Sequence, residues 1–431
     1  MKKLQLGAFA FLSAALMVGC SSQTEKGEIE VVTEIQSPVQ IEFWHSMSGA
    51  LGESLTELVG KFNDTIGKEK GITVESVFQG GYTDAKSKVM AAIKSGESPA
   101  IVQGTSNDIQ DYLLSGTVQP LNDYIFNEEV GIGDFDDIYN VYKEESLQYD
   151  GETYYSMPFS KSTDLLYYNK TFFDEHGLEI PTTWEEVVEV SKQITEITGK
   201  PSFGIDNTAN FLITGLKQLG GKYTNKDGEI LFNNQESLYI LELLNENIKN
   251  GNWRLAGEDG YMSGPFMSGL SQMYVGSTAG SSFLSSTDFE WSSALVPQFS
   301  EDNKAAITQG SSLAILNGNK TAEEVYAAYE FVKYLCSYES NLYWATNTGY
   351  LPIRHTVANS EEFKTYIEES NDTTKLYGSQ QTAYGFVEAS FVGDNSTSNI
   401  VRTEVGAMVD EVVLTNLEPQ KALDIYESKL K

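Results

Sequence analysis

The sequence predicts an α/β fold in two lobes, and three observations support that prediction. The N-terminal third alternates strand-like and helix-like segments, which is typical of an open parallel sheet. The apolar run from Leu165 to Tyr168 follows a group of small polar residues, so it can cross between lobes while offering hydroxyl groups at the crossing. At 431 residues and 40% hydrophobic content, the chain is long and apolar enough for more than one core.

The first residues have the pattern of an export signal. Two lysines precede an apolar run from Leu4 to Val18, which is shorter than the roughly 20 residues of a membrane-spanning helix. The run ends in Met17-Val-Gly-Cys20, which resembles the lipobox of bacterial lipoproteins, where the cysteine receives diacylglycerol. We expect a signal peptide over 1–19, lipidation of Cys20 and a lipid-anchored polar linker over 20–38. The alternative is ordinary cleavage, with Cys20 incidental.

Apolar spacing and capping patterns predict the elements that follow. Thr183 and Glu186 form a capping box that starts a helix ending at Gly199, and Thr321 with Glu324 starts another. Strands are expected over Val39–Trp44, Gly71–Val77, Ala100–Gln103 and Gln272–Val275, and further helices over Leu51–Phe62, Ala85–Ser95, Gln235–Lys249 and from Pro419 onward.

The composition argues against several classes of function. A formal net charge of −32 opposes binding to nucleic acid, whose phosphates need a basic surface. The three histidines lack ligand spacing, so no metal site is expected, and no nucleotide-binding or serine-hydrolase motif occurs, so no cofactor is expected. Cys336 lies in an apolar helical pattern and is interpreted as a core residue. The acidic run Asp134–Asp137 is interpreted as a helix start.

Six short segments together resemble one family. They are Phe43-Trp-His-Ser-Met47, Gly80-Gly-Tyr82, Ser98-Pro-Ala-Ile-Val-Gln103, Met157–Lys170, Asn347-Thr-Gly-Tyr-Leu-Pro-Ile353 and Pro419-Gln-Lys-Ala-Leu423. From about Ile41 to the C-terminus, the chain is similar to the glycerol-3-phosphate and glycerophosphodiester-binding proteins of bacterial ABC importers. The resemblance implies a class II fold of two lobes with several crossovers that closes on its ligand. Residues 39–162 with 277–335 would form the first lobe, and 163–276 with 336–431 the second.

The resemblance also implies a ligand site. Its positions are the tyrosine after the second strand, a hydroxyl at the first crossing, a serine at the second, the glycine of a Gly-Ser-Ser turn, the tyrosine of Thr-Gly-Tyr-Leu-Pro, and an arginine placed by its distance to Pro419. In this chain they are Tyr82, Ser162, Ser277, Gly310, Tyr350 and Arg402. Relatives carry an acidic residue where this chain has Ser106, with Asn107 and Asp108 beside it.

Phosphate chemistry fits this set, because a phosphoryl group needs several donors and prefers one guanidinium. Each residue also has a more ordinary interpretation. A lone tyrosine usually belongs to a core or its rim, and a serine near glycine usually belongs to a turn. Arg402 beside Glu404 would then be a surface ion pair worth little.

The sequence therefore predicts a lipid-anchored, monomeric binding protein on the extracellular face of the cell membrane. It would capture glycerol-3-phosphate or a glycerophosphodiester such as glycerophosphocholine by lobe closure, and deliver it to ABC permease subunits. Two alternatives stay open. One is an oligosaccharide-binding protein, for which 24 tyrosines and 5 tryptophans could supply stacking surfaces. The other is an extracellular hydrolase, because 61 acidic residues leave a catalytic carboxylate pair possible.

Overall fold

The structure, a computed structural model, describes residues 31–285, 288–393 and 395–431. The predicted signal peptide and Cys20 lie outside the described residues. The described strands are β1 (Val39–His45), β2 (Ile72–Phe78), β3 (Ile101–Gly104), β4 (Met157–Asn169), β5 (Phe203–Ile205), β6 (Trp253–Leu255), β7 (Met273–Ser277), β8 (Trp291–Ala294), β9 (Ala306–Ile315) and β10 (Gly385–Phe386).

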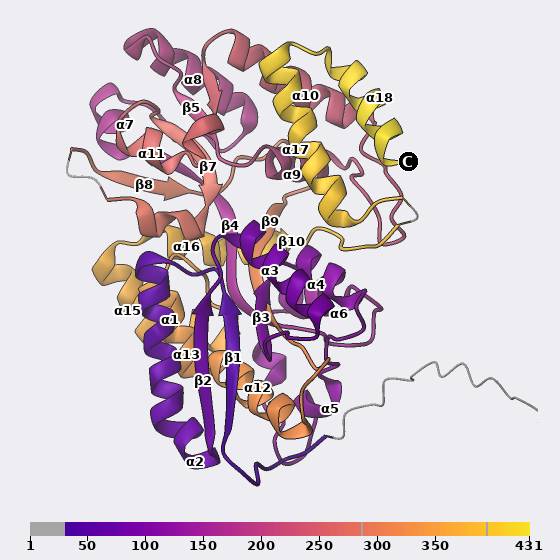
Figure 1. Ribbon diagram of the computed structural model, residues 1–431. Coiled ribbons are helices and arrows are strands. Elements are labelled where there is room, and N and C mark those ends of the chain that lie inside the picture. Colours follow the sequence, from indigo (N-terminus) through magenta and orange to yellow (C-terminus); the bar gives the residue numbers. More distant parts are fainter. Residues whose placement is uncertain (1–30, 286–287, 394) are drawn as a thin grey trace, which may run out of the picture.

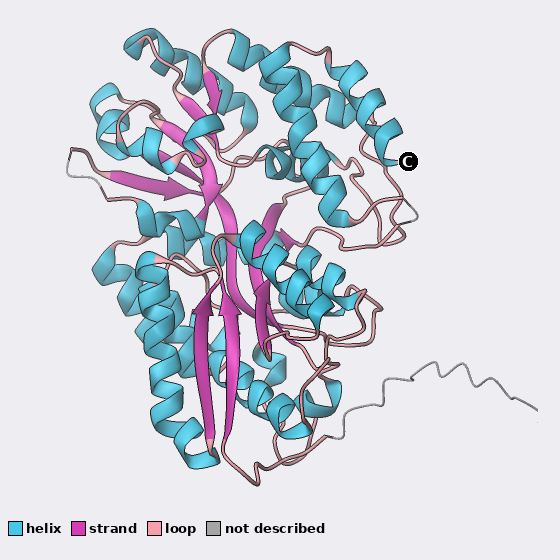
Figure 2. Ribbon diagram, in the orientation of Figure 1, coloured by secondary structure: helices cyan, strands magenta, loops and turns pink. Residues whose placement is uncertain are grey.

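Strand pairing runs continuously from one lobe into the other, in the order β2-β1-β3-β9-β4-β7-β5-β6, with β10 beside β9 and β8 beside β4. Strand β1 pairs in parallel with β2 and β3, which confirms the open parallel sheet predicted for the N-terminal third. Figure 2 shows these strands running through the middle of the molecule with helices outside them.

The helices divide between the lobes (Figure 1). The first lobe holds α1 (Gly49–Phe62), α2 (Lys68–Lys70), α3 (Tyr82–Ser95), α4 (Ser106–Leu113), α5 (Asn122–Ile125), α6 (Asn140–Leu147), α12 (Ala322–Leu335), α13 (Tyr338–Asn347), α14 (His355–Ala358) and α15 (Glu361–Ser370). The second holds α7 (Lys170–His176), α8 (Trp184–Thr198), α9 (Thr208–Leu219), α10 (Gln235–Lys249), α11 (Ser263–Met267), α17 (Ser398–Thr415) and α18 (Pro419–Leu430). Helix α16 (Thr373–Gln381) contacts β4 and β8 where the lobes meet.

Strand β4 joins the lobes, as the sequence predicts. All 13 of its residues are buried. Its first part pairs with β9 and its second part with β7 and β8. Met157 and Phe159 pack in the first core, whereas Leu166 and Tyr168 pack in the second. The strand begins at Met157, so the predicted hydroxyl-rich entrance is itself part of the sheet.

The two cores divide the chain at other places than the predicted domain boundaries. Strand β9 starts with Ala306 and Ile307 in the second core and ends with Leu313 in the first. Ala279 packs against the first core just after residue 277, but Val296 is again in the second core, so a further return to the first lobe runs along β9. Ile353 still packs in the first core and Phe391 in the second, so the last crossing follows residue 353 and not residue 335.

Local signals in the sequence set several helix boundaries as expected. Thr183 Oγ1 accepts a hydrogen bond from the Glu186 N–H at 3.2 Å, and α8 ends at Gly199 in the left-handed conformation. The same capping box starts α12, and Pro419 lies in the first turn of α18. Cys336 is fully buried in the first core, which confirms its interpretation as a core residue.

The described end of the predicted linker contacts the first lobe. Val31, Val32 and Ile35 are partly buried against its core, and the Gln36 N–H donates to Glu323 at 3.3 Å. Residues 31–38 are therefore not a free spacer. In the described ranges, no helix is long and apolar enough to cross a membrane.

Candidate ligand site between the lobes

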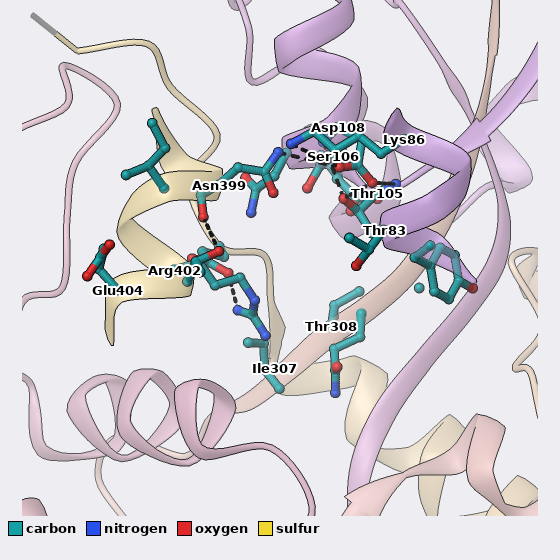
Figure 3. A pocket seen from close by; sticks show the side chains of 18 residues that line it. Thr83, Lys86, Thr105, Ser106, Asp108, Ile307, Thr308, Asn399, Arg402 and Glu404 are labelled. Atoms are coloured by element: carbon teal, nitrogen blue, oxygen red, sulfur yellow. Dashed lines mark hydrogen bonds and ion pairs between the residues drawn. The ribbon is translucent and has the colours of Figure 1, made fainter. Parts of the chain in front are cut away.

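A cavity of about 480 Å³ lies beside the crossing strands and is lined by both lobes. Helices α3 and α4 of the first lobe form one wall, α17 of the second lobe forms the other, and β9 lies between them (Figure 3). Four of the seven predicted ligand residues line this cavity, namely Tyr82, Ser106, Gly310 and Arg402. The fold thus brings together positions that are far apart in the sequence.

Tyr82 and Tyr350 form a pair of phenols at one side of the cavity. Their hydroxyl oxygens are 3.2 Å apart. Tyr82 begins α3 and is partly exposed, whereas Tyr350 is buried, and burial raises the pKa of the Tyr350 phenol well above its usual value. Both phenols are therefore protonated at neutral pH and can donate hydrogen bonds. Tyr350 does not line the cavity itself and reaches it through Tyr82.

The Thr-Gly-Tyr-Leu-Pro segment owes its position to contacts at the crossing. A Cβ on Gly349 would lie 2.5 Å from the Thr278 carbonyl oxygen, so only glycine fits there. The Leu351 N–H donates to the Lys161 carbonyl of β4 at 2.8 Å. The buried Lys375 ammonium of α16 donates to the Thr348 and Tyr350 carbonyls. These contacts fix Tyr350 against the strands that join the lobes, and sequence reasoning missed Lys375.

Gly310 requires glycine for its backbone conformation. Its φ is +99°, and a Cβ there would lie 1.8 Å from the Ser160 carbonyl oxygen. It faces Lys161 of β4, close to an irregularity in the register after Pro158. The expected Gly-Ser-Ser turn is wrong, because Gly310 lies within β9. The close approach of the two strands brings the backbone of β9 into the cavity wall.

Ser106 is the first residue of α4 and faces the cavity (Figure 3). The neighbouring polar groups have other partners. The Asp108 carboxylate accepts from the Thr105 N–H and hydroxyl at 3.1 and 2.7 Å and completes a capping box. Asn107 Oδ1 accepts from the Ser390 hydroxyl at 2.8 Å. Because both neighbours are engaged, Ser106 is the side chain of this group with no competing hydrogen-bond partner among the described residues, and its contact with a ligand stays a prediction.

Arg402 enters the cavity from α17 of the second lobe. Its Nη1 donates to the Glu388 carboxylate and its Nη2 to Asn210 Oδ1. Burial alone would lower the pKa of the guanidinium, but Glu388 raises it, so Arg402 keeps its positive charge at neutral pH. The surface-pair interpretation with Glu404 is wrong, because Glu404 pairs with Lys429 and projects away from Ser106 (Figure 3).

A buried carboxylate is linked to Arg402 through one intervening side chain. Asp164 of β4 accepts from Asn210 Nδ2 at 3.0 Å and from Gln309 Nε2 at 2.6 Å. Burial raises the pKa of Asp164 to about 6, although these two hydrogen bonds oppose the shift. Asn210 thus links Asp164 to Arg402, and Gln309 links it to the cavity wall. The only sign of this network in the sequence is a single acid between the polar and the apolar half of β4.

Ser162 and Ser277 do not line the cavity. Ser162 is buried in β4 opposite Gln309. Ser277 ends β7 opposite Asp164, and its hydroxyl caps the following turn by accepting from the Ala279 N–H at 3.2 Å. Both serines are thus neighbours of cavity-lining or network residues, and their contact with a ligand stays a prediction.

A second cavity of about 480 Å³ adjoins the first on the side of the second lobe. Asn399, Arg402 and Thr403 line both, so the two cavities meet at α17. Asp206 lies in its wall and accepts from the Met262 N–H at 2.6 Å, and burial raises the pKa of Asp206 to about 6. Among the described residues, no cluster of three or more histidines, cysteines or acids could hold a metal ion.

Several known proteins resemble this chain in sequence. The sn-glycerol-3-phosphate-binding periplasmic protein UgpB of Shigella dysenteriae is 26% identical over 411 residues, which cover 90% of this chain and 91% of that protein. UgpB of Yersinia pseudotuberculosis is 27% identical over 334 residues, covering 73% of this chain and 74% of that protein.

Solved structures share the two-lobed fold. UgpB from Mycobacterium tuberculosis in complex with glycerophosphocholine superposes with a TM-score of 0.79 at 20% identity. The cyclic alpha-maltosyl-1,6-maltose binding protein of Arthrobacter globiformis superposes with a TM-score of 0.76 at 21% identity. Each match covers 91% of this chain and 98% of the other.

The family model of bacterial extracellular solute-binding proteins matches residues 57–370, which is most of the chain. Members of this family are the substrate-binding proteins of transporters and not enzymes, which removes the hydrolase alternative. This chain belongs to the bacterial extracellular solute-binding proteins and is the binding component of an ABC importer.

Proposed function

We propose that this protein captures glycerol-3-phosphate or a glycerophosphodiester such as glycerophosphocholine. The observation that carries the proposal is the place of Arg402, whose guanidinium lies in the wall of the interlobe cavity together with Tyr82 and Gly310. A guanidinium and a phenol are the donors that a phosphoryl group needs without a metal. The relatives named for glycerol-3-phosphate binding support the same ligand class.

The arrangement also suggests how binding would close the lobes. Arg402 belongs to the second lobe, whereas Tyr82 and Ser106 belong to the first. A phosphoryl compound that contacts both walls would bind the closed arrangement more tightly than an open one. Ligand binding would therefore shift the population towards closure, which is the state that a permease would recognise.

The test is the affinity of Arg402→Ala for glycerophosphocholine and glycerol-3-phosphate, measured by titration calorimetry. Removing one partner of a charge-assisted contact costs about 2–5 kcal/mol, so affinity for the preferred ligand should fall at least about 30-fold. Arg254→Ala is the matched control, because Arg254 is an arginine of the same lobe that pairs with Asp259 and does not line the interlobe cavity. Unchanged phosphoryl binding by Arg402→Ala would refute the proposal.

An oligosaccharide is the second candidate ligand. The structural match to a protein that binds cyclic maltosyl-maltose favours it, as do the carboxylates in the cavity wall, which can accept hydrogen bonds from sugar hydroxyls. A neutral sugar does not need the charge of Arg402. Thermal stabilisation by maltose that survives Arg402→Ala, with no stabilisation by either phosphoryl compound, would favour this candidate.

We also propose that Cys20 carries the lipid that holds the protein on the extracellular face of the membrane, beside its permease. The support is the Met17-Val-Gly-Cys20 segment after a charged and then apolar start. Cys20→Ala should release the protein from the membrane fraction, or leave an uncleaved precursor, and should block incorporation of labelled palmitate. A monomer is expected in solution, and light scattering of the soluble domain checks it.

A further inference from the structure

The charged groups in the wall of the cavity proposed to hold a phosphoryl group are already paired. The lining includes four carboxylates, on Asp108, Glu145, Glu388 and Glu404, and two cations, on Lys86 and Arg402. Glu145 and Glu404 have partners outside the lining, Lys161 and Lys429. Both cations already have carboxylate partners. Lys86 lies 2.6 Å from Asp111, and Arg402 bonds to Glu388. Among the described lining residues, no cation is free to neutralise the full charge of an incoming dianion.

Glu388 is the carboxylate that matters most, because it contacts the guanidinium directly. Its side chain is only 9% exposed. One oxygen accepts from Arg402, and the other is buried without a hydrogen bond of acceptable geometry. The Tyr223 phenol lies close enough for its pKa to be raised first by burial and then by the Glu388 charge. Glu388 is therefore a poorly solvated negative charge beside the group that would bind phosphate.

The charge of Glu388 discriminates between classes of phosphate. A monoester carries about −1.5 to −2 at neutral pH because its second pKa is about 6, whereas a diester carries a single negative charge. An oxyanion on Arg402 would lie close to the Glu388 carboxylate, and like charges at such short range oppose each other strongly. Glu388 already neutralises part of the Arg402 charge, so the guanidinium can offset at most one negative charge of a ligand. A second negative charge on the ligand is therefore penalised.

We propose that Glu388 sets the charge of the ligand, so that the cavity selects glycerophosphodiesters over dianionic phosphate monoesters. This inference rests on the proposed function, because it concerns the same cavity. Glu388 acts here through Arg402, as a specificity-determining neighbour of the binding group. The adjoining cavity, with Asp206 in its wall, gives the second substituent of a diester a place on the other side of Arg402.

The experiment compares three ligands at pH 7.5 by titration calorimetry. They are glycerol-3-phosphate, which is mostly a dianion, glycerophosphoglycerol, which is a monoanion, and glycerophosphocholine, which is a zwitterion. Both diesters should bind wild-type protein at least about tenfold more tightly than the monoester, given the cost of opposed like charges. In Glu388→Gln the preference should shrink at least about tenfold through a gain for glycerol-3-phosphate.

Two variants control for indirect effects. Asp174→Asn removes a carboxylate from the Lys170 pair, which lines neither cavity, and should leave all three affinities unchanged. Glu388→Asp keeps the charge and should keep the preference for diesters. Circular dichroism and Tm establish that each variant is folded before its affinities are compared.

The outcomes separate this inference from the proposed function. If wild-type protein binds the phosphoryl ligands but Glu388→Gln changes all three affinities equally, only the assignment to Glu388 is overturned. Equal or tighter binding of glycerol-3-phosphate by wild-type protein also overturns it, without any variant. If wild-type protein binds none of the three ligands, the proposed function falls and takes this inference with it.

Discussion

Two arginines of this protein have carboxylate partners, yet their surroundings differ. Arg354 is 3% exposed and directs its donors to Asp134, Asp137 and the Cys336 carbonyl within the first lobe. Arg402 is 23% exposed, and the hydrogen bonds of its guanidinium are to two side chains, Glu388 and Asn210. Arg402 also lines the cavity between the lobes, which Arg354 does not.

The difference separates a structural cation from a binding one. A guanidinium has five N–H donors, and a buried donor without a partner costs free energy. At Arg354 the protein itself supplies backbone and carboxylate acceptors from several elements, so the side chain fastens the loop before α6 to the end of α12 and the start of α14. At Arg402 both acceptors are side chains and the residue also lines the cavity, so a ligand oxyanion can join them there.

The largest effect should come from Arg354→Ala. Removing one partner of a buried ion pair costs about 3–5 kcal/mol, so the free energy of unfolding should fall by about that amount. The measurement is urea denaturation followed by circular dichroism. Protein that is still folded should bind its ligand with wild-type affinity, unlike Arg402→Ala. Loss of binding in the folded Arg354 variant would break the contrast between the two arginines.

Gly310→Ala tests whether the close approach of β9 to β4 in the cavity wall requires glycine. A positive φ at a non-glycine residue costs about 1–3 kcal/mol, and the clash with the Ser160 carbonyl adds to it, so a loss of about 3 kcal/mol in unfolding free energy is expected. Gly96→Ala is the control, because Gly96 has a φ of +77° but no atom within 4 Å of its Cβ position. Equal losses in the two variants would show that strand contact at Gly310 is unimportant.

The smallest of the three effects concerns Asp164, the buried acid that Asn210 links to Arg402. Burial raises the pKa of Asp164 to about 6 from its ordinary value of 3.8, so the folded state holds this proton more tightly than the unfolded state does. Its contribution to stability is fully present below pH 3.8 and is lost as pH rises through 6. Between pH 5 and 7.5 the loss should be about 1.4 kcal/mol, the value of one pKa unit.

Asp164→Asn should remove that pH-dependent part, so the difference in unfolding free energy between variant and wild type should change by this amount between the two pH values. Urea denaturation at pH 5 and 7.5 measures it. Asp206 titrates in the same range and is retained in the variant, so its contribution cancels in the difference. A difference that is independent of pH would contradict the raised pKa.

Short-range signals explain why much of the fold could be predicted. The capping box at Thr183 and the apolar setting of Cys336 depend on nearby residues, and both predictions were confirmed. The course of β9 was not predicted, because Thr308, Gln309 and Gly310 interrupt the apolar pattern of its middle. The acids at 134–137 do start a helix, a single 3-10 turn over Phe135–Asp137. Their distant role was not predicted, because Asp134 and Asp137 bind Arg354, which is 220 residues away from Asp134.

In the candidate site, too, long-range contacts could not be predicted from short-range signals. Tyr82 could be placed because it lies in a distinctive segment, and Arg402 by its distance to another such segment. The fold brings both to one cavity with Ser106 and Gly310. Glu388 and Asn210 lie in segments with no such pattern, and their importance comes only from their contact with Arg402. Sequence reasoning therefore found the candidate donors and missed the groups that balance their charge.

The fully buried strand β4 has a consequence for how the molecule denatures. Each half of this strand completes a different core, and β9 beside it is shared in the same way. Neither half of the protein can lose its structure while the other keeps an intact central strand. The two lobes should therefore melt together in one cooperative transition, although the proposed closure would move them as separate bodies.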